Sequence, residues 1–381
     1  MKYFDYTATT PVDSEVLETY INTTKKFFAN TTSLHRLGEE SNHMYEVCTR
    51  RIKDIIGLNN HKLVYTSNAT EANNLAIFGT VLKYEKAKII TTKIEHPSVY
   101  NVFKELEDKY EVIYLNVNNE GIIDLKQLKE EMNQDVVLVS IMWVNNILGS
   151  VQPIKEVIDI VKKYKKAHLH VDCVQGICKV IPNFNFNDID MFTFSTHKIY
   201  GPKGIGGLFV REGIELNKRL YGSSSQFSIK PGTFDLSLVA STAKCFIKFY
   251  NKTCDHKEDV KKKYLYLREK LEKNNKIVFN TNGDNISYYI LNISLIGIRG
   301  ETIVHTLERD EIYVSTGSSC SSKLAKPEKT IYAISESNER STSTVRISLS
   351  FLTTYEEIDA LVDAINKITN GVKWLWRMIW Y

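Results

Sequence analysis

The chain has 381 residues, 43% of them hydrophobic and 25% charged, and a formal net charge of +4. This length suits one large domain and one smaller domain, and the composition is that of a globular protein. The small charge argues neither for nor against nucleic acid, with which we expect no direct contact, and no run of about 18 apolar residues is present to span a membrane.

The predicted elements alternate between helix and strand through the first two thirds of the chain. Helices are predicted over residues 12–28 and 38–57, from Glu71 to Ile77, from Ser98 onward, and over 125–132 and 153–165. Strands are predicted over residues 62–66, 88–92, 112–117, 136–143, 168–172 and 188–194. Such alternation predicts an α/β domain with a mostly parallel sheet covered on both faces.

Ligands of such sheets bind beyond the carboxyl ends of the strands. Thr70, His96, Asn146, Asp172 and Lys198 each lie at or just after a predicted strand end. We therefore expect these five side chains to meet at one edge of the sheet.

The pattern changes at about residue 255. Helices are predicted over 255–273, 300–309 and 354–369, and strands over 285–295 and 344–349. This mixture predicts a smaller α+β domain formed by residues 1–11 and 255–381, beside a large domain of residues 12–254. The aromatic segment 374–381 is too short to span a membrane, and we expect it to pack on the protein or on a partner subunit.

Lys198 stands between the apolar strand that ends at Phe194 and a loop rich in glycine, from Gly201 to Gly207. A buried ammonium without a partner is costly, and the usual outcome is a lowered pKa. Such an amine is a nucleophile that forms Schiff bases with carbonyl compounds and with pyridoxal phosphate. A solvated lysine on a surface turn is the alternative that this segment alone leaves open.

Three further patterns bear on function. The turn Ser67–Glu71 opens a helix, where free N–H groups favour an anion, although ordinary helix capping explains it as well. The spacing of His168, His170 and Cys173 suits a metal, but strand alternation explains it better, and we expect no metal. The six cysteines include no Cys-x-x-Cys pair and Met1–Asp5 has no apolar signal-peptide core, so we expect a cytoplasmic protein with free thiols.

Together these segments resemble the cysteine desulfurases of the NifS/IscS type, in the class V branch of fold-type I pyridoxal-phosphate enzymes. The resemblance covers essentially the whole chain, with the motifs in the family's order and spacing. It rests on Phe4-Asp-Tyr-Thr-Ala-Thr-Thr-Pro11, Thr66-Ser-Asn-Ala-Thr-Glu-Ala-Asn-Asn-Leu-Ala-Ile77, Glu95-His-Pro97, Val144-Asn-Asn146, His170-Val-Asp-Cys-Val-Gln175, Ser195-Thr-His-Lys-Ile-Tyr-Gly-Pro-Lys-Gly-Ile-Gly206, Ser315-Thr-Gly-Ser-Ser-Cys320 and Val345-Arg-Ile-Ser-Leu349.

The resemblance implies a site for pyridoxal 5'-phosphate. Lys198 would form the Schiff base, and Asp172 would keep the pyridine nitrogen protonated so that the ring accepts electrons. Gln175 and Asn146 would hydrogen-bond the ring hydroxyl or the substrate, and His96 would stack over the ring and act as an acid–base group. A core or capping histidine is the alternative for His96.

The remaining implied roles concern the phosphate, the substrate and the sulfur. The phosphate would be held by Ala69, Thr70, Ser195 and His197 of one subunit and by Thr233 of its partner, which implies a homodimer with sites at the interface. Arg346 would bind the carboxylate of L-cysteine in a bidentate fork.

The family's second catalytic residue matches Cys320. Its thiolate would attack the sulfur of the substrate and carry it as a persulfide, releasing L-alanine. The sulfur would pass to an acceptor for iron–sulfur cluster assembly or for thiolation of tRNA, a cofactor or DNA. Cys320 lies among Ser, Thr and Gly, which is typical of an exposed loop. The other cysteines are expected to be bystanders.

Three positions depart from the family pattern. Ile147 stands where the family has Glu, Gly222-Ser-Ser-Ser-Gln226 replaces a Gly-Gly-Gly-Gln-Glu-like stretch, and Lys230 replaces an Arg that would offer a fork. They suggest a divergent desulfurase that serves a dedicated sulfur pathway. Two alternatives stay open: a class V aminotransferase or selenocysteine lyase in which Cys320 is incidental, and a non-catalytic scaffold.

Overall fold

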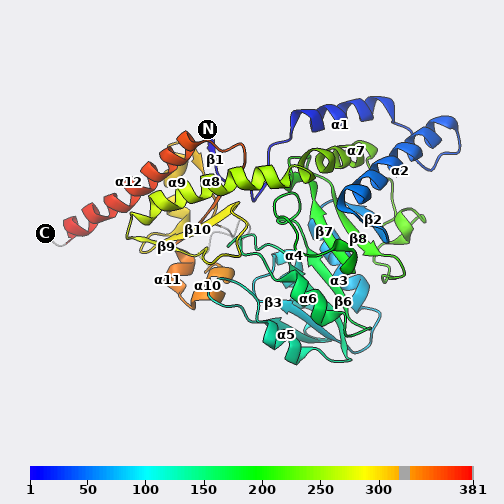
Figure 1. Ribbon diagram of the computed structural model, residues 1–381, viewed down its shortest axis with the longest axis horizontal. Coiled ribbons are helices and arrows are strands. Elements are labelled where there is room, and N and C mark those ends of the chain that lie inside the picture. Colours follow the sequence, from blue (N-terminus) through cyan, green and yellow to red (C-terminus); the bar gives the residue numbers. More distant parts are fainter. Residues whose placement is uncertain (317–326, 380–381) are drawn as a thin grey trace.

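The computed structural model describes residues 1–316 and 327–379, with side chains as far as Gly371. Its centre is a seven-stranded sheet in the order β2-β8-β7-β6-β5-β3-β4 (Figure 1). The strands are β2 (His61–Thr66), β3 (Lys88–Thr92), β4 (Glu111–Leu115), β5 (Val136–Met142), β6 (His168–Asp172), β7 (Met191–Ser195) and β8 (Gly206–Arg211). The predicted α/β class with a mostly parallel sheet is confirmed.

One strand of this sheet runs against the others. β8 pairs antiparallel with both β7 and β2, whereas the remaining neighbours pair in parallel. The link from Ser195 to Gly206 is shorter than the crossover of a dozen or more residues that a parallel strand needs. Because β8 reverses, β2 ends at the same edge as β3, β5, β6 and β7. Gly206, which begins β8, is the register partner of both Thr66 and Ser195.

Helices cover both faces of the sheet. They are α1 (Ser14–Lys26), α2 (Arg36–Ile56), α3 (Ala69–Val81), α4 (Pro97–Leu106), α5 (Leu125–Glu131), α6 (Ile154–Val161) and α7 (Leu236–Cys245). Side chains of alternate strand residues point to opposite faces of the sheet. On β8, Leu208 and Val210 pack with α3 and α4, whereas Phe209 packs with α2, α6 and α7. Both faces are therefore dry, which leaves the edge at the strand ends for polar chemistry.

A second, smaller sheet lies beside the first. β10 (Ile290–Leu295) pairs antiparallel with β9 (Ile277–Phe279) and β12 (Thr344–Ser348), and β1 (Lys2–Tyr3) pairs with β11 (Ile312–Tyr313). Its helices are α8 (Thr253–Glu272), α9 (Gly300–Glu308), α10 (Lys329–Ser335), α11 (Asn338–Thr342) and α12 (Tyr355–Ile379). Figure 1 shows α8 leading from the side of α7 across this sheet. The proposed domain boundaries at residues 11 and 254 stay a prediction.

The elements differ from their predicted bounds where the backbone turns. β10 starts at Ile290 and not at residue 285, because Tyr288 adopts a left-handed φ of 62° that a strand does not accept. β7 starts at Met191, after a 3₁₀ turn at Phe186–Asp188. α7, α10 and α11 were not predicted, although Asp235 caps α7 by accepting from the N–H groups of Ser237 and Leu238. No helix in the described ranges is long and apolar enough to cross a membrane.

Candidate active site

Polar residues meet where the strands end, as the sequence predicts. Asp172, the last residue of β6, is the register partner of Met142 on β5 and of Thr193 on β7. Lys198 follows β7 in a short 3₁₀ turn, and His96 caps the start of α4. Burial is the largest influence on the pKa of His96, and the charges of Asp172 and Lys198 also act on it, as expected for groups that share one site.

The amine of Lys198 is held by backbone carbonyls. Its Nζ donates to the carbonyl oxygens of Thr7 at 2.7 Å and of Ala8 at 2.5 Å. Burial, followed by the charge of Arg346, lowers the pKa of Lys198 to about 8. Within the described residues no carboxylate pairs with this amine, so it reaches its neutral, nucleophilic form more easily than an ordinary lysine.

This lowered pKa predicts how the reactivity of Lys198 changes with pH. Only the neutral amine reacts with an acylating reagent, so its labelling rate should rise with pH and level off above about pH 8. In urea-unfolded protein the same lysine should instead keep gaining reactivity up to about pH 10.4. Peptide mass spectrometry after brief labelling measures both profiles. Coinciding profiles for folded and unfolded protein would contradict the described environment.

Asn73, which the sequence analysis did not single out, connects Asp172 to His96. Its Nδ2 donates to Asp172 Oδ2 and to Ser98 Oγ, both at 2.9 Å, and its Oδ1 accepts from Thr193 Oγ1 at 2.7 Å. A fully buried asparagine within the apolar helix α3 needs such partners. A polar residue in an otherwise apolar helix is therefore the sequence feature that could have identified Asn73.

The proton of neutral His96 lies on Nε2. Its Nδ1 accepts from the N–H of Ser98 at 3.1 Å and lies 2.8 Å from Ser98 Oγ. Burial lowers the pKa of His96, so the ring is neutral at pH 7. The capping role offered as an alternative is therefore real, but it leaves Nε2–H free for chemistry.

Gln175 lies in a chain of hydrogen bonds that reaches Lys198. Its Nε2 donates to the carbonyl of Thr7 at 3.1 Å, the same oxygen that accepts from Lys198. Its Oε1 accepts from Nζ of Lys179 at 2.9 Å. Lys179 was not predicted as a site residue, because nothing in its local sequence indicates burial.

The edge of the sheet offers hydrogen-bond donors to an anion. Ser195 is 1% exposed, and its Oγ has no partner in the described part of the chain. A Cβ on Gly206 would lie 3.1 Å from the nitrogen of Ala69, so β8 and the start of α3 are in direct contact. The first N–H groups of α3, at Ala69 and Thr70, have no acceptor within the helix. These donors fit a phosphate group.

His197 follows Ser195 in the chain at the same edge of the sheet, and its ring is neutral at pH 7. Its Nδ1 lies 3.1 Å from Oγ1 of Thr9, and burial, followed by the charge of Lys198, lowers its pKa to about 4. It can therefore donate one N–H to an anion but brings no charge at pH 7.

Arg346, from β12, brings a guanidinium to the same site. It is 3% exposed; Nη2 donates to Asp5 Oδ1 at 2.9 Å and Nη1 donates to the backbone carbonyl of Asn146 at 3.0 Å, while Nε has no partner among the described residues. Asp5 was not predicted as a site residue. For Asn146, the described contact with the site is this carbonyl, and its hydrogen bond to the ring hydroxyl or the substrate stays a prediction.

The departures from the family pattern have structural explanations. Ile147 is 3% exposed and packs with Leu148 and with Ile331 of α10, an apolar setting that suits isoleucine better than a carboxylate. Gln226 anchors its loop through Oε1, which accepts from the N–H of Tyr65 at 2.6 Å. Lys230 Nζ lies 3.6 Å from Glu71 Oε2, so its charge is retained near the start of α3.

One predicted residue is not joined to this cluster within the described part of the chain. Thr233 is exposed, after the loop that Gln226 anchors. Cys320 lies outside the described residues. Among the described cysteines, burial raises the pKa of Cys48, Cys173, Cys178 and Cys245, which disfavours the thiolate, and Cys254 is exposed at the start of α8.

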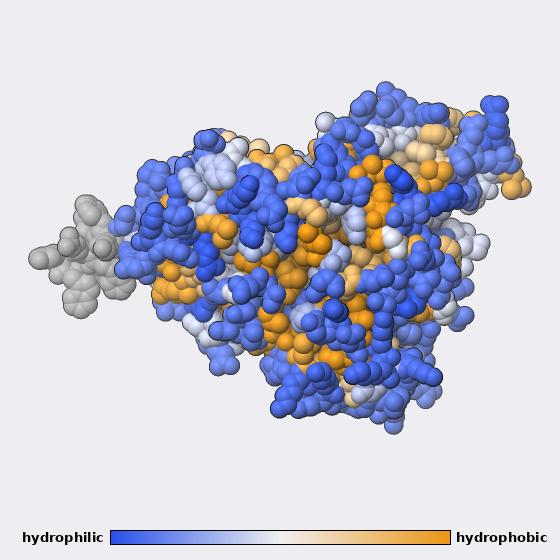
Figure 2. All heavy atoms as spheres, in the orientation of Figure 1, coloured by the Kyte–Doolittle hydropathy of each residue, from blue (hydrophilic) through white to orange (hydrophobic). Residues whose placement is uncertain are grey.

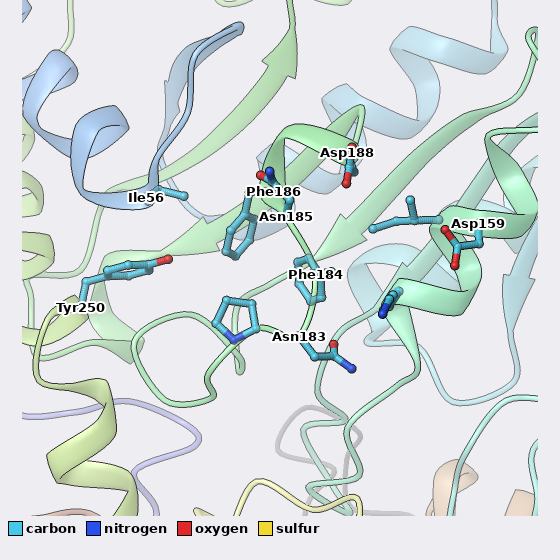
Figure 3. A pocket seen from close by; sticks show the side chains of 11 residues that line it. Ile56, Asp159, Asn183, Phe184, Asn185, Phe186, Asp188 and Tyr250 are labelled. Carbon is cyan, nitrogen blue, oxygen red and sulfur yellow. The ribbon is translucent and has the colours of Figure 1, made fainter.

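A surface pocket of about 570 Å³ lies apart from these residues (Figure 3). Phe184, Phe186 and Tyr250 form its apolar wall, and Asp159, Asn183 and Asn185 supply polar groups. It includes none of the predicted site residues. The convergence of buried functional groups at the strand ends, rather than cavity size, identifies the candidate active site.

Comparison with known proteins gives one consistent family. Residues 2–361 match the model of the aminotransferase class-V family. A "NifS/IcsS protein homolog" of Lactobacillus delbrueckii subsp. bulgaricus is 38% identical, with 97% of each chain covered, and the "Cysteine desulfurase IscS" of Dictyoglomus turgidum is 32% identical, with 97% of this chain and 95% of the relative covered.

Solved structures agree with this grouping. A "NIFS-LIKE PROTEIN" superposes with a TM-score of 0.90 at 29% identity, covering 97% of this chain and 100% of the other. The structure described as "SspA in complex with cysteine" superposes with a TM-score of 0.80 at 30% identity, covering 93% of this chain and 100% of the other.

Proposed function

The chain belongs to the class V aminotransferase family and, within it, to the cysteine desulfurases of the NifS/IscS type, and from that premise we propose how its own residues act. Its substrate is L-cysteine, its product is L-alanine, and its cofactor is pyridoxal 5'-phosphate. One observation carries the proposal: the lowered-pKa amine of Lys198 lies in one site with the carboxylate of Asp172 and the guanidinium of Arg346.

The residues at the edge of the sheet fit this cofactor. Lys198 would bind it covalently, and Asp172 would hold a proton on its ring nitrogen. The free Oγ of Ser195, the N–H groups of Ala69 and Thr70, and the ring of His197 would receive its phosphate; Gln175 would donate to its ring oxygen. When bound, pyridoxal phosphate accepts the electrons that leave the substrate Cα.

The substrate would be oriented by Arg346 and its protons moved by two bases. The Nε–H of Arg346 is unpaired within the described residues and would donate to the substrate carboxylate. Nζ of Lys198, neutral near its lowered pKa, would take the proton from Cα. Neutral His96 would stack on the ring and give or take a proton at Nε2. Asn146 would support Arg346 through its carbonyl.

Cys320 would receive the sulfur. Its thiolate attacks the sulfur of L-cysteine, the S–S bond forms as the C–S bond breaks, and the electron pair stays with the carbon that becomes the methyl group of alanine. L-Cysteine and one thiol thus give L-alanine and one persulfide. The described cysteines support this assignment, because the buried ones are poor nucleophiles.

Exchanging Cys320 for serine tests this step. Cys320→Ser should bind the cofactor as the unmodified protein does, yet form no persulfide and release alanine at least about 100-fold more slowly, because the hydroxyl is a far weaker nucleophile. Cys254→Ser, which changes the exposed cysteine of α8, is the matched control and should behave as wild type. Sulfur transfer by Cys320→Ser at the wild-type rate would remove Cys320 from the mechanism.

We further propose a homodimer in which Thr233 reaches the partner's phosphate. Thr233 is exposed, and so are apolar side chains of the surrounding region, which Figure 2 shows in part as orange spheres near the junction of α1 and α2. The large exposed ones of this region are Leu17, Ile21, Phe28, Leu34, Leu37, Val47, Leu220, Tyr221 and Phe227. An apolar surface rimmed by charge is typical of a subunit interface.

Mixing two inactive variants tests whether the site is shared. Thr233→Asp would repel the partner's phosphate, and Lys198→Ala lacks the amine. If Thr233 acts across the interface, hybrid dimers contain one intact site, and random mixing should restore about a quarter of wild-type activity. Subunits are exchanged by co-refolding and the activity is compared with each variant alone. No gain on mixing would show that Thr233 serves its own subunit or none.

The sulfur acceptor is the remaining partner. We propose an acceptor protein of iron–sulfur cluster assembly, or of tRNA, cofactor or DNA thiolation, in a cytoplasmic setting where the free cysteines stay reduced.

A further inference from the structure

Lys179 is a buried lysine that pairs with no carboxylate among the described residues. It is 6% exposed, and in the part of the chain that the structure describes its Nζ makes one hydrogen bond, to Gln175 Oε1. Lys88 is equally buried, but its Nζ lies 2.6 Å from Glu131 and 3.2 Å from Glu111. Burying an amine beside a neutral amide costs stability that an ion pair would partly return, so packing alone does not explain Lys179.

The charged groups around Lys179 belong to the active site. Burial, followed by the charge of Lys198, lowers the pKa of Lys179 to about 7; Arg346 also lowers it, and the thiol of Cys178 acts in the opposite direction. Through Gln175 and the carbonyl of Thr7, Lys179 is connected to the amine of Lys198 by three consecutive hydrogen bonds.

The contact with Lys179 determines which way the amide of Gln175 points. A carboxamide has an acceptor end and a donor end. A lysine that donates to Oε1 fixes the acceptor end away from the site, so that Nε2, with two N–H groups, faces Thr7. One N–H is used by the carbonyl of Thr7, and the other remains for a ligand oxygen. The reversed amide would set Oε1 against that carbonyl, which is repulsive.

We propose that Lys179 is a positioning residue, which holds the amide of Gln175 so that Nε2 donates to the ring oxygen of the bound cofactor. This inference rests on the proposed pyridoxal-phosphate site and assigns Lys179 no contact with the substrate. Since the ring oxygen is part of the chromophore, losing the donor should change the spectrum of the bound cofactor as well as its affinity.

Three variants test the proposal. Lys179→Met should weaken pyridoxal phosphate binding to the cofactor-free protein by about 10-fold, because a buried acceptor loses its donor. It should also shift the absorbance maximum of the bound cofactor and lower kcat, with KM for L-cysteine unchanged. Lys179→Gln keeps an N–H donor and should restore the wild-type spectrum. Lys88→Met, the matched buried lysine, should lower thermal stability without changing the spectrum.

A double-mutant cycle separates positioning from general damage. Gln175→Leu should produce the same spectral shift, and adding Lys179→Met to it should change the spectrum and the affinity no further. An unshifted spectrum in Lys179→Met, or additive losses in the double variant, would overturn the inference while the cofactor site stands. A wild-type protein that takes up no pyridoxal phosphate would overturn both.

Discussion

Replacing Lys198 with methionine should abolish desulfurase activity. The loss of proton transfer at Cα alone should cost about 10²–10⁴-fold in kcat, and the covalent link to the cofactor disappears as well. The variant should fold, since methionine matches the length of the buried stem and removes an amine that is costly to bury. Release of alanine and the absorbance of the protein with added pyridoxal phosphate measure the two losses.

Lys203→Met is the control for this variant. Lys203 is exposed in the same glycine-rich loop, so its replacement should leave both the activity and the absorbance unchanged. Persistent activity in Lys198→Met, with activity lost instead in Lys203→Met, would mean that the lysine was assigned wrongly.

Asp172→Asn should give the second large effect. Removing one partner of a buried charge pair costs about 3–5 kcal/mol, equivalent to roughly 10²–10⁴-fold in kcat/KM. The asparagine keeps one acceptor, so its Oδ1 can still accept from the N–H of Val174, while its NH₂ group takes the place of the oxygen that accepts from Nδ2 of Asn73. Because the side chain keeps its shape and loses one buried hydrogen bond, the fold should persist and the cofactor should still bind. The deficit should therefore appear in kcat far more than in cofactor affinity. Steady-state kinetics at saturating cofactor measure it.

A surface aspartate gives the comparison for this change. Asp188→Asn removes a charge from a side chain that pairs with Lys162 at the surface, and it should leave the kinetics unchanged. An Asp172→Asn enzyme as active as the Asp188→Asn enzyme would contradict the role of Asp172.

Local sequence was enough to predict the functional residues that are ionisable and stand at the end of an apolar strand. Lys198, Asp172 and His96 each follow an apolar strand, and strands that end at one edge bring such residues together. The family resemblance marked Ile147 as a departure, but the apolar contact with Ile331 that explains it joins segments far apart in the chain.

Residues whose role depends on distant partners could not be predicted in this way. Asp5 binds Arg346 across 341 positions, and Lys179 is recognisable only once Gln175 and its burial are known. Thr7 acts through its backbone carbonyl. Every residue has such a carbonyl, so the identity of the side chain gives no sign of this role. The reversal of β8 and the contact between the Asn146 carbonyl and Arg346 are likewise products of tertiary geometry.

In the proposed function, this site removes sulfur from L-cysteine and passes it to Cys320. A single turnover of the pyridoxal-phosphate-loaded protein with L-cysteine, without reductant, measures it most directly. We expect one alanine per active site, matched by one added sulfur atom on the peptide that contains Cys320 and on no other cysteine. Transfer of the amino group to a pyruvate-type acceptor, with no alanine derived from cysteine and no added sulfur, would contradict it.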